Sequence, residues 1–70
     1  MKYYLNLNPQ QSHNEHELHK ENCSHLPNKN YLSYIGDFSS EIDALNAAII
    51  KYPYFLIDGC YYCCNSVHRF

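Results

Sequence analysis

The sequence predicts a small α+β fold, in which one helix packs across a small antiparallel sheet and a Cys-rich knuckle follows at the C-terminal end. Three observations predict it. The chain has 70 residues, which is enough for a single domain (residues 1–70) with a thin apolar core. Two short stretches have strand composition and one has a helical repeat. Four Cys and five His supply the disulfides or metal ligands that domains of this size commonly need.

The first predicted strand covers residues 1–8 and ends at Pro9. Its apolar side chains alternate, so that one face carries Tyr3, Leu5 and Leu7. The polar residues 10–17 that follow, rich in Gln, Asn and His, predict a flexible loop in which His13 and His16 are exposed. Residues 26–30 contain Pro and two Asn and predict a turn.

The second predicted strand covers residues 31–35 and ends at Gly36-Asp37. A helix is predicted over residues 40–52, with Ser39 or Ser40 capping its first amides and Pro53 ending it. Four apolar side chains recur at helical spacing and predict the buried stripe of this helix: Ile42, Leu45, Ile49 and Tyr52.

The C-terminal third begins with a short apolar extended run over residues 54–57. Asp58-Gly59 predicts a turn into the Cys cluster. Residues 65–70 predict one further helical turn.

Charge and hydropathy exclude several function classes. The formal net charge is −2, and the five basic residues are scattered along the chain, so binding to double-stranded DNA is not expected. No apolar run approaches the roughly 20 residues of a membrane-spanning helix. The N-terminus lacks the apolar core of a secretory signal, which favours a cytoplasmic location, although a secreted chain after signal removal would look the same.

Two close pairs of metal-ligating residues are the most informative motif. Cys60 and Cys63 form a Cys-x2-Cys pair after a Gly, and His19 and Cys23 form a His-x3-Cys pair upstream. Zinc binds thiolates and neutral imidazoles in a closed tetrahedron when its role is structural. The sequence therefore predicts one structural zinc ion on His19, Cys23, Cys60 and Cys63.

The ligand set has alternatives. Cys64, His68 and His25 lie close enough in sequence to serve as reserve ligands. A metal-free fold, in which reduced Cys side chains pack as small apolar groups, would explain the same residues. Disulfides would also explain them, and four Cys allow three pairings.

At residues 18–63 the chain resembles small bacterial domains of the Ada-type zinc-binding family. These domains carry two ligand pairs, the first with spacing x3 and the second with spacing x2, and a strand and a helix lie between the pairs. The resemblance implies the scaffold and the ligand positions. In the DNA-repair members, the first ligand is a Cys that accepts a methyl group. That position is His19 here, so the resemblance does not imply methyl transfer.

The predicted function is that of a non-enzymatic interaction module, a monomer or weak homodimer, in which zinc fixes a surface around Tyr61 and Tyr62 for a protein partner. Packing over the metal is an alternative role for the same two rings. A second class of function is thiol redox chemistry or metal handling at Cys60, Cys63 and Cys64. A third is a nucleic-acid-binding module, since Tyr rings can stack on unpaired bases. A nucleophilic site at Cys64 and His68 would need an orienting group, which the sequence does not indicate.

Overall fold

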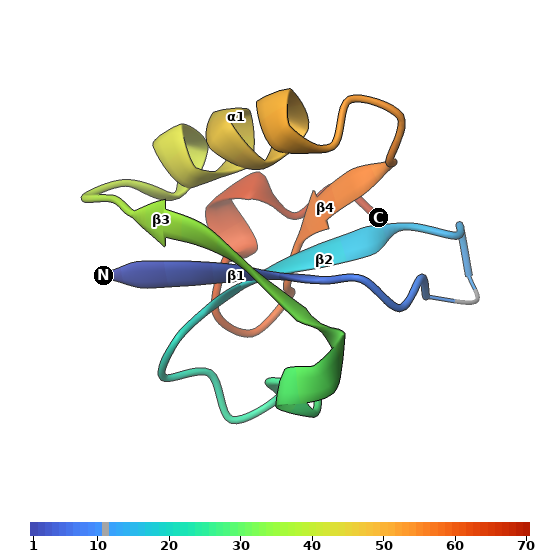
Figure 1. Cartoon of the computed structure of the whole chain (residues 1–70), viewed down its shortest axis with the longest axis horizontal. Helices are drawn as coiled ribbons and strands as arrows, with labels where there is room; N and C mark the ends of the chain where they lie inside the picture. Colours follow the sequence, from blue (N-terminus) through green and yellow to red (C-terminus); the bar gives the residue numbers. More distant parts are fainter. Residues whose placement is uncertain (11) are drawn as a thin grey trace.

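The computed structural model describes residues 1–10 and 12–70, and it has a four-stranded mixed sheet with one helix packed across it (Figure 1). The elements in chain order are β1 (Lys2–Asn6), β2 (His16–Lys20), β3 (Leu32–Asp37), α1 (Glu41–Lys51) and β4 (Ile57–Gly59). Two short 3₁₀ turns cover Lys29–Tyr31 and Asn65–Val67. The predicted α+β class is confirmed. No helix in the described ranges has the length and hydrophobicity that crossing a membrane requires.

The strands lie in the order β3-β1-β2-β4. β1 pairs antiparallel with both β2 and β3, whereas β2 and β4 are parallel, so the sheet is mixed where an antiparallel sheet was expected. The parallel pair follows from the connection: α1 carries the chain from the β3 edge across one face to the opposite edge, so β4 runs in the same direction as β3. A crossover of this kind is how parallel strands are joined.

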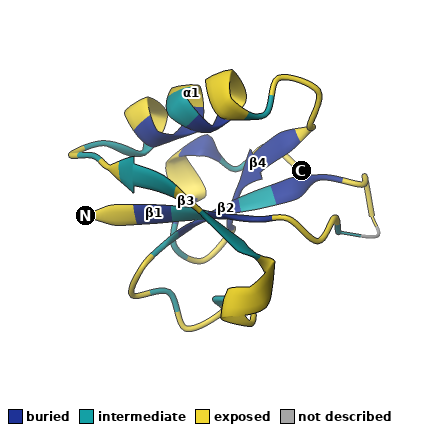
Figure 2. Cartoon of the chain, in the orientation of Figure 1, coloured by how far each residue is buried: buried dark blue, intermediate teal, exposed yellow. Residues whose placement is uncertain are grey.

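The hydrophobic core lies between α1 and the sheet (Figure 2). Tyr3 and Leu5 of β1 and Leu18 of β2 face the helix and are at most 2% exposed. The predicted alternation of β1 is therefore confirmed for Tyr3 and Leu5. Leu7 lies beyond the strand and is 38% exposed, so the prediction was wrong for that residue.

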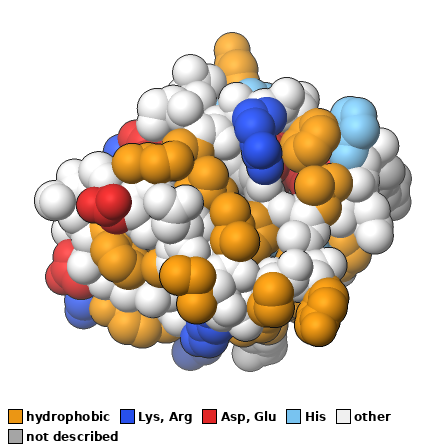
Figure 3. Space-filling view, turned by 90° about the horizontal axis from the view of Figure 1, so that it is seen from above, with side chains coloured by type: hydrophobic (Ala, Val, Ile, Leu, Met, Phe, Trp, Pro, Cys, Tyr) orange, Lys and Arg blue, Asp and Glu red, His pale blue; other side chains and the backbone are white. Residues whose placement is uncertain are grey.

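α1 begins after Ser40, whose Oγ accepts a hydrogen bond from the Asp43 amide at 3.2 Å, and it ends before Pro53. The predicted buried stripe was wrong for two of its residues, because Ile42 is 52% exposed and Ile49 is 43% exposed. The helix instead buries a face of small side chains around one Leu, namely Ala44, Leu45 and Ala48. Alanines let the helix axis lie close to the sheet, which turns the larger isoleucines outward. Seen from above, this side of the molecule carries many hydrophobic side chains (Figure 3).

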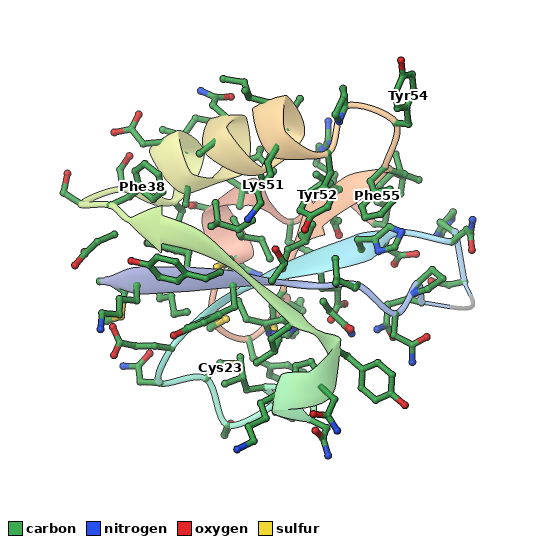
Figure 4. All side chains as sticks on the ribbon, in the orientation of Figure 1. Cys23, Phe38, Lys51, Tyr52, Tyr54 and Phe55 are labelled. Atoms are coloured by element: carbon green, nitrogen blue, oxygen red, sulfur yellow. The ribbon has the colours of Figure 1, made fainter. Side chains whose placement is uncertain are left out.

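The predicted loop at residues 10–17 ends earlier than expected, because His16 and Glu17 belong to β2. Gln11 lies outside the described residues. His16 was expected to be exposed but is buried: its ring stacks on Phe55 at 3.8 Å, and its Nδ1 lies 3.0 Å from the Asn6 carbonyl oxygen. Phe55 in turn stacks on Tyr52 (Figure 4). Four of the five residues of β2 are polar, so the strand shows no alternation of apolar and polar side chains.

Asp58 and Gly59 were expected to form a turn, but both belong to β4. The fully buried Asp58 carboxylate accepts hydrogen bonds from the Arg69 amide at 2.6 Å and the Phe70 amide at 3.3 Å, so the C-terminal residues are tied to this strand. A Cβ on Gly59 would collide with the Cys64 carbonyl and the Val67 side chain. Glycine is therefore needed for the C-terminal 3₁₀ turn to pack against β4.

Candidate metal centre

The register of β2 and β4 explains how the two ligand pairs meet. In this parallel pair Leu18 lies opposite Gly59, and the Cys60 amide donates to the Leu18 carbonyl at 2.9 Å. The next residue on each strand is a ligand, His19 on β2 and Cys60 after β4. Both pairs therefore leave the sheet at the same end of two neighbouring strands. Cys23 follows in the loop on the side of the sheet opposite α1 (Figure 4).

Four ligand atoms come together at this point, one each from His19, Cys23, Cys60 and Cys63, and all lie within 4.8 Å of one another. The Sγ atoms of Cys23 and Cys60 are 3.9 Å apart, and Cys63 Sγ is 3.9 Å from His19 Nδ1. In a regular tetrahedron around zinc, two sulfurs lie about 3.8 Å apart and a sulfur and a nitrogen about 3.6 Å apart. The four side chains can therefore hold one metal ion.

Backbone amides point at two of the thiol groups. The Lys20 amide donates to Cys63 Sγ at 3.3 Å, and the His25 amide donates to Cys23 Sγ at 3.4 Å. Amides of the knuckle also favour ionisation of Cys60, although burial outweighs them. Hydrogen bonds of this kind stabilise a thiolate, which is the form of Cys that binds metal.

The electrostatics of the cluster favour neutral side chains until a cation is bound. Burial raises the pKa of Cys60 to about 12 and also raises the pKa of Cys23. The neighbouring Cys64 thiol and burial raise the pKa of Cys63. Burial, assisted by His25, lowers the pKa of His19 to about 4, so its imidazole is neutral at pH 7. Neutral imidazole is the ligating form of His, and buried thiols of this kind release protons when metal binds.

The three reserve ligands lie outside the four-residue cluster. Cys64 is fully buried in the core, with its Sγ 3.8 Å from Cys63 Sγ. His68 is held by the Gly59 carbonyl and the Asp58 carboxylate, each 2.9 Å from its Nδ1. His25 stacks on the Tyr62 ring. Within the described ranges, the residues that gather for a metal ion are His19, Cys23, Cys60 and Cys63.

Tyr61 and Tyr62 lie between the two Cys of the knuckle and point outward, 58% and 66% exposed. The Tyr62 ring stacks on His25 with a centroid distance of 3.8 Å and an interplanar angle of 14°. Tyr61 contacts Tyr62 edge-on at 5.2 Å. The Cys-x2-Cys turn thus carries an exposed aromatic surface between two of the candidate ligands.

One residue near the site was missed in the sequence, Glu17. Its Oε1 lies 3.5 Å from His19 Nε2. Residues two apart on a strand point to the same face, so the Glu17-x-His19 spacing could have indicated the neighbourhood once β2 was recognised as a strand.

Comparisons with known proteins do not place the chain in a family. A scan against protein-family models, a search of curated proteins and a search of solved structures each found no match. The resemblance to Ada-type domains therefore stays a prediction.

Proposed function

We propose that this chain is a non-enzymatic domain stabilised by one structural zinc ion on His19, Cys23, Cys60 and Cys63, which presents Tyr61 and Tyr62 to a protein partner. The observation that carries the proposal is the meeting of four ligand atoms within 4.8 Å from two segments 37 positions apart in the chain. Cys23 and Cys60 are too far apart in the sequence to meet through local structure, so only the fold brings them together.

The donor set supports zinc among the biological metals. Three thiols and one imidazole are soft to borderline ligands, which disfavours calcium and magnesium. Four protein ligands fill a tetrahedron and leave no open position for a substrate, which is typical of structural rather than catalytic zinc. The ion would join the end of β2 to the turn after β4.

The aromatic surface supports the interaction part of the proposal. Aromatic side chains are enriched in protein–protein interfaces, and Tyr combines an apolar ring with a hydrogen-bonding hydroxyl. Because Tyr61 and Tyr62 stand between two ligands, zinc would fix the turn that displays them.

Thiol redox chemistry has weaker support. Reactive thiols usually have a lowered pKa and are accessible. Here burial raises the pKa of Cys60 to about 12, and Cys64 is fully buried. Buried thiols with a raised pKa are better suited to bind metal than to act as nucleophiles.

A scaffold like that of the Ada-type domains is part of the proposal. Its support is the x3 and x2 ligand spacing, with β3, α1 and β4 between the pairs. The proposal that the chain is bacterial rests on this resemblance. A cytoplasmic location is also proposed, because thiols remain reduced and available to metal there.

Mass spectrometry under native and denaturing conditions tests the proposal. We expect one zinc ion per folded chain, four alkylatable thiols after denaturation, and the oligomeric state from the same spectrum. A folded wild-type chain without metal, or with a Cys60–Cys63 disulfide, would refute the zinc site.

Binding experiments test the interaction surface once a partner is identified. Tyr61→Ser and Tyr62→Ser should weaken binding and retain one zinc ion, because neither side chain is a ligand. Substitution of the distant exposed Tyr54 by Ser is the matched control, since Tyr54 lies in the loop after α1 and is 98% exposed. Equal effects of all three substitutions would argue against a surface at the knuckle.

A further inference from the structure

The two ring nitrogens of His19 have different surroundings. Nδ1 faces the metal cluster, 3.9 Å from Cys63 Sγ. Nε2 is buried and, within the described ranges, has no hydrogen-bond partner. When an imidazole ligates a metal through one nitrogen, the other nitrogen carries a proton and normally donates it to an acceptor. His19 therefore needs an acceptor on its Nε2 side.

Glu17 is placed to be that acceptor. Its Oε1 lies 3.5 Å from His19 Nε2, and both side chains project from the same face of β2. A shift of a few tenths of an ångström would bring the pair to hydrogen-bond distance. The Glu17 side chain is only 25% exposed, so water competes for its carboxylate less than at a fully exposed site.

The neighbouring carboxylate on β4 is already engaged. Asp58 lies opposite Glu17 in the sheet, but its oxygens accept the Arg69 and Phe70 amides and contact His68. Glu17 has no comparable hydrogen bonds within the described ranges. Of these two carboxylates, Glu17 is therefore the one that remains available to accept a hydrogen bond from His19.

We propose that Glu17 is a positioning residue of the metal centre. Its carboxylate accepts a hydrogen bond from the His19 Nε2–H and thereby fixes the tautomer in which Nδ1 is free to bind metal. The proposal rests on the zinc site proposed above and adds the residue that orients its single nitrogen ligand. Carboxylates that hold a ligating His in this way also raise the basicity of the imidazole.

The tautomer of His19 is the first test. Long-range ¹H–¹⁵N correlation spectra of the zinc-loaded wild-type protein distinguish a protonated from a metal-bound ring nitrogen. We expect Nε2 to be protonated and Nδ1 to be bound. Metal binding through Nε2 would overturn the proposal without any substitution.

Zinc affinity is the second test, measured by competition with a chromophoric chelator. Glu17→Ala should weaken zinc binding roughly 10- to 100-fold. Glu17→Gln should lose less affinity, since its amide oxygen still accepts a hydrogen bond from the His19 Nε2–H. Asp43→Asn is the matched control: Asp43 is an exposed carboxylate in the first turn of α1, away from the metal ligands, and its removal should leave affinity unchanged.

The two proposals fail in distinguishable ways. If the wild-type chain binds no zinc, the proposed metal centre is refuted, and the proposed role of Glu17 is refuted with it. If the wild-type chain binds zinc and the affinity of Glu17→Ala stays within about twofold of it, only the proposed role of Glu17 is refuted. If Glu17→Ala does not fold, Glu17→Gln and the wild-type tautomer decide the question.

Discussion

At the scale of single residues, the candidate ligands are positioned by contacts that need no metal. Backbone amides already donate to Cys23 and Cys63, and the strand pairing already places His19 beside Cys60. In the folded chain these contacts set the positions of the ligands, so zinc binding and folding support each other. The fourth Cys, Cys64, shows the contrast: it lies next to Cys63 in sequence, yet its side chain belongs to the core.

Two alanine substitutions separate ligand from core thiol. Cys60→Ala should abolish stoichiometric zinc binding, because it leaves three ligands. Cys64→Ala should lower stability through lost packing but retain one ion per chain. Co²⁺ substitution provides the measurement, since tetrahedral thiolate sites give strong visible absorption. If Cys60→Ala kept the tetrahedral Co²⁺ spectrum, Cys60 would not be a ligand. If folded Cys64→Ala lost that spectrum, Cys64 would be a ligand and not only a core residue.

Acid should destabilise the zinc-loaded protein. Zinc binds the neutral imidazole and the thiolates, so protons compete with the ion for all four ligands as the pH falls. Burial acts in the same direction in the metal-free fold, where it lowers the pKa of His19 from 6.5 to about 4, so the unfolded chain takes up the proton first and stability is lost as the pH falls from 6.5 toward 4. We therefore expect lower stability at pH 5 than at pH 7. Urea unfolding at the two pH values measures the difference, and equal midpoints and slopes would contradict the buried neutral imidazole.

At the scale of elements, the parallel β2–β4 pair carries the site and the small-residue face of α1 carries the core. Hydrophobic spacing predicted that α1 exists, and the capping Ser and Pro53 predicted where it begins and ends. It did not predict the rotation of the helix, because Ile42 and Ile49 form as good an apolar stripe as Ala44, Leu45 and Ala48. Only packing against the sheet, where alanines permit close approach, selects the buried face.

The rotation of α1 can be tested by truncating one residue on each face. Leu45→Ala should destabilise the fold by about 2–5 kcal/mol, because Leu45 is 7% exposed in the core. Ile42→Ala should cost less than about 1 kcal/mol, because its side chain is 52% exposed. Chemical denaturation of both variants gives the comparison. A larger loss of stability for Ile42→Ala than for Leu45→Ala would indicate that the face predicted from the sequence is the buried one.

At the scale of the whole molecule, the sequence predicted the α+β class, the positions of β1, β3 and α1, and the four residues that the fold brings together. The x3 and x2 spacings were informative because a chelating pair is local, and the strands only have to bring two pairs together. Glu17, His16 and Asp58 could not be placed in the same way. Their positions depend on where β2 and β4 begin and end, and hydrophobic periodicity does not encode short strands that contain buried polar side chains.

Because the molecule is small, a bound metal ion would contribute a large part of its folding stability. A domain of 70 residues has a small core, and thirteen large hydrophobic residues among those that the structure describes are exposed, including Ile50 and Tyr54. Structural zinc contributes about 10–16 kcal/mol in small zinc-finger peptides, which is comparable to the whole stability of a typical domain, about 5–15 kcal/mol. On this account, the zinc ion determines whether the chain is folded.

The most direct test follows the fold while the metal is removed. Zinc-loaded protein is incubated with excess EDTA at pH 7.5 under reducing conditions, and far-ultraviolet circular dichroism and zinc content are recorded together. The account predicts that secondary structure is lost as zinc leaves and returns when zinc is added back in equimolar amount. Zinc-free protein that keeps its circular dichroism spectrum and its cooperative thermal transition would contradict it.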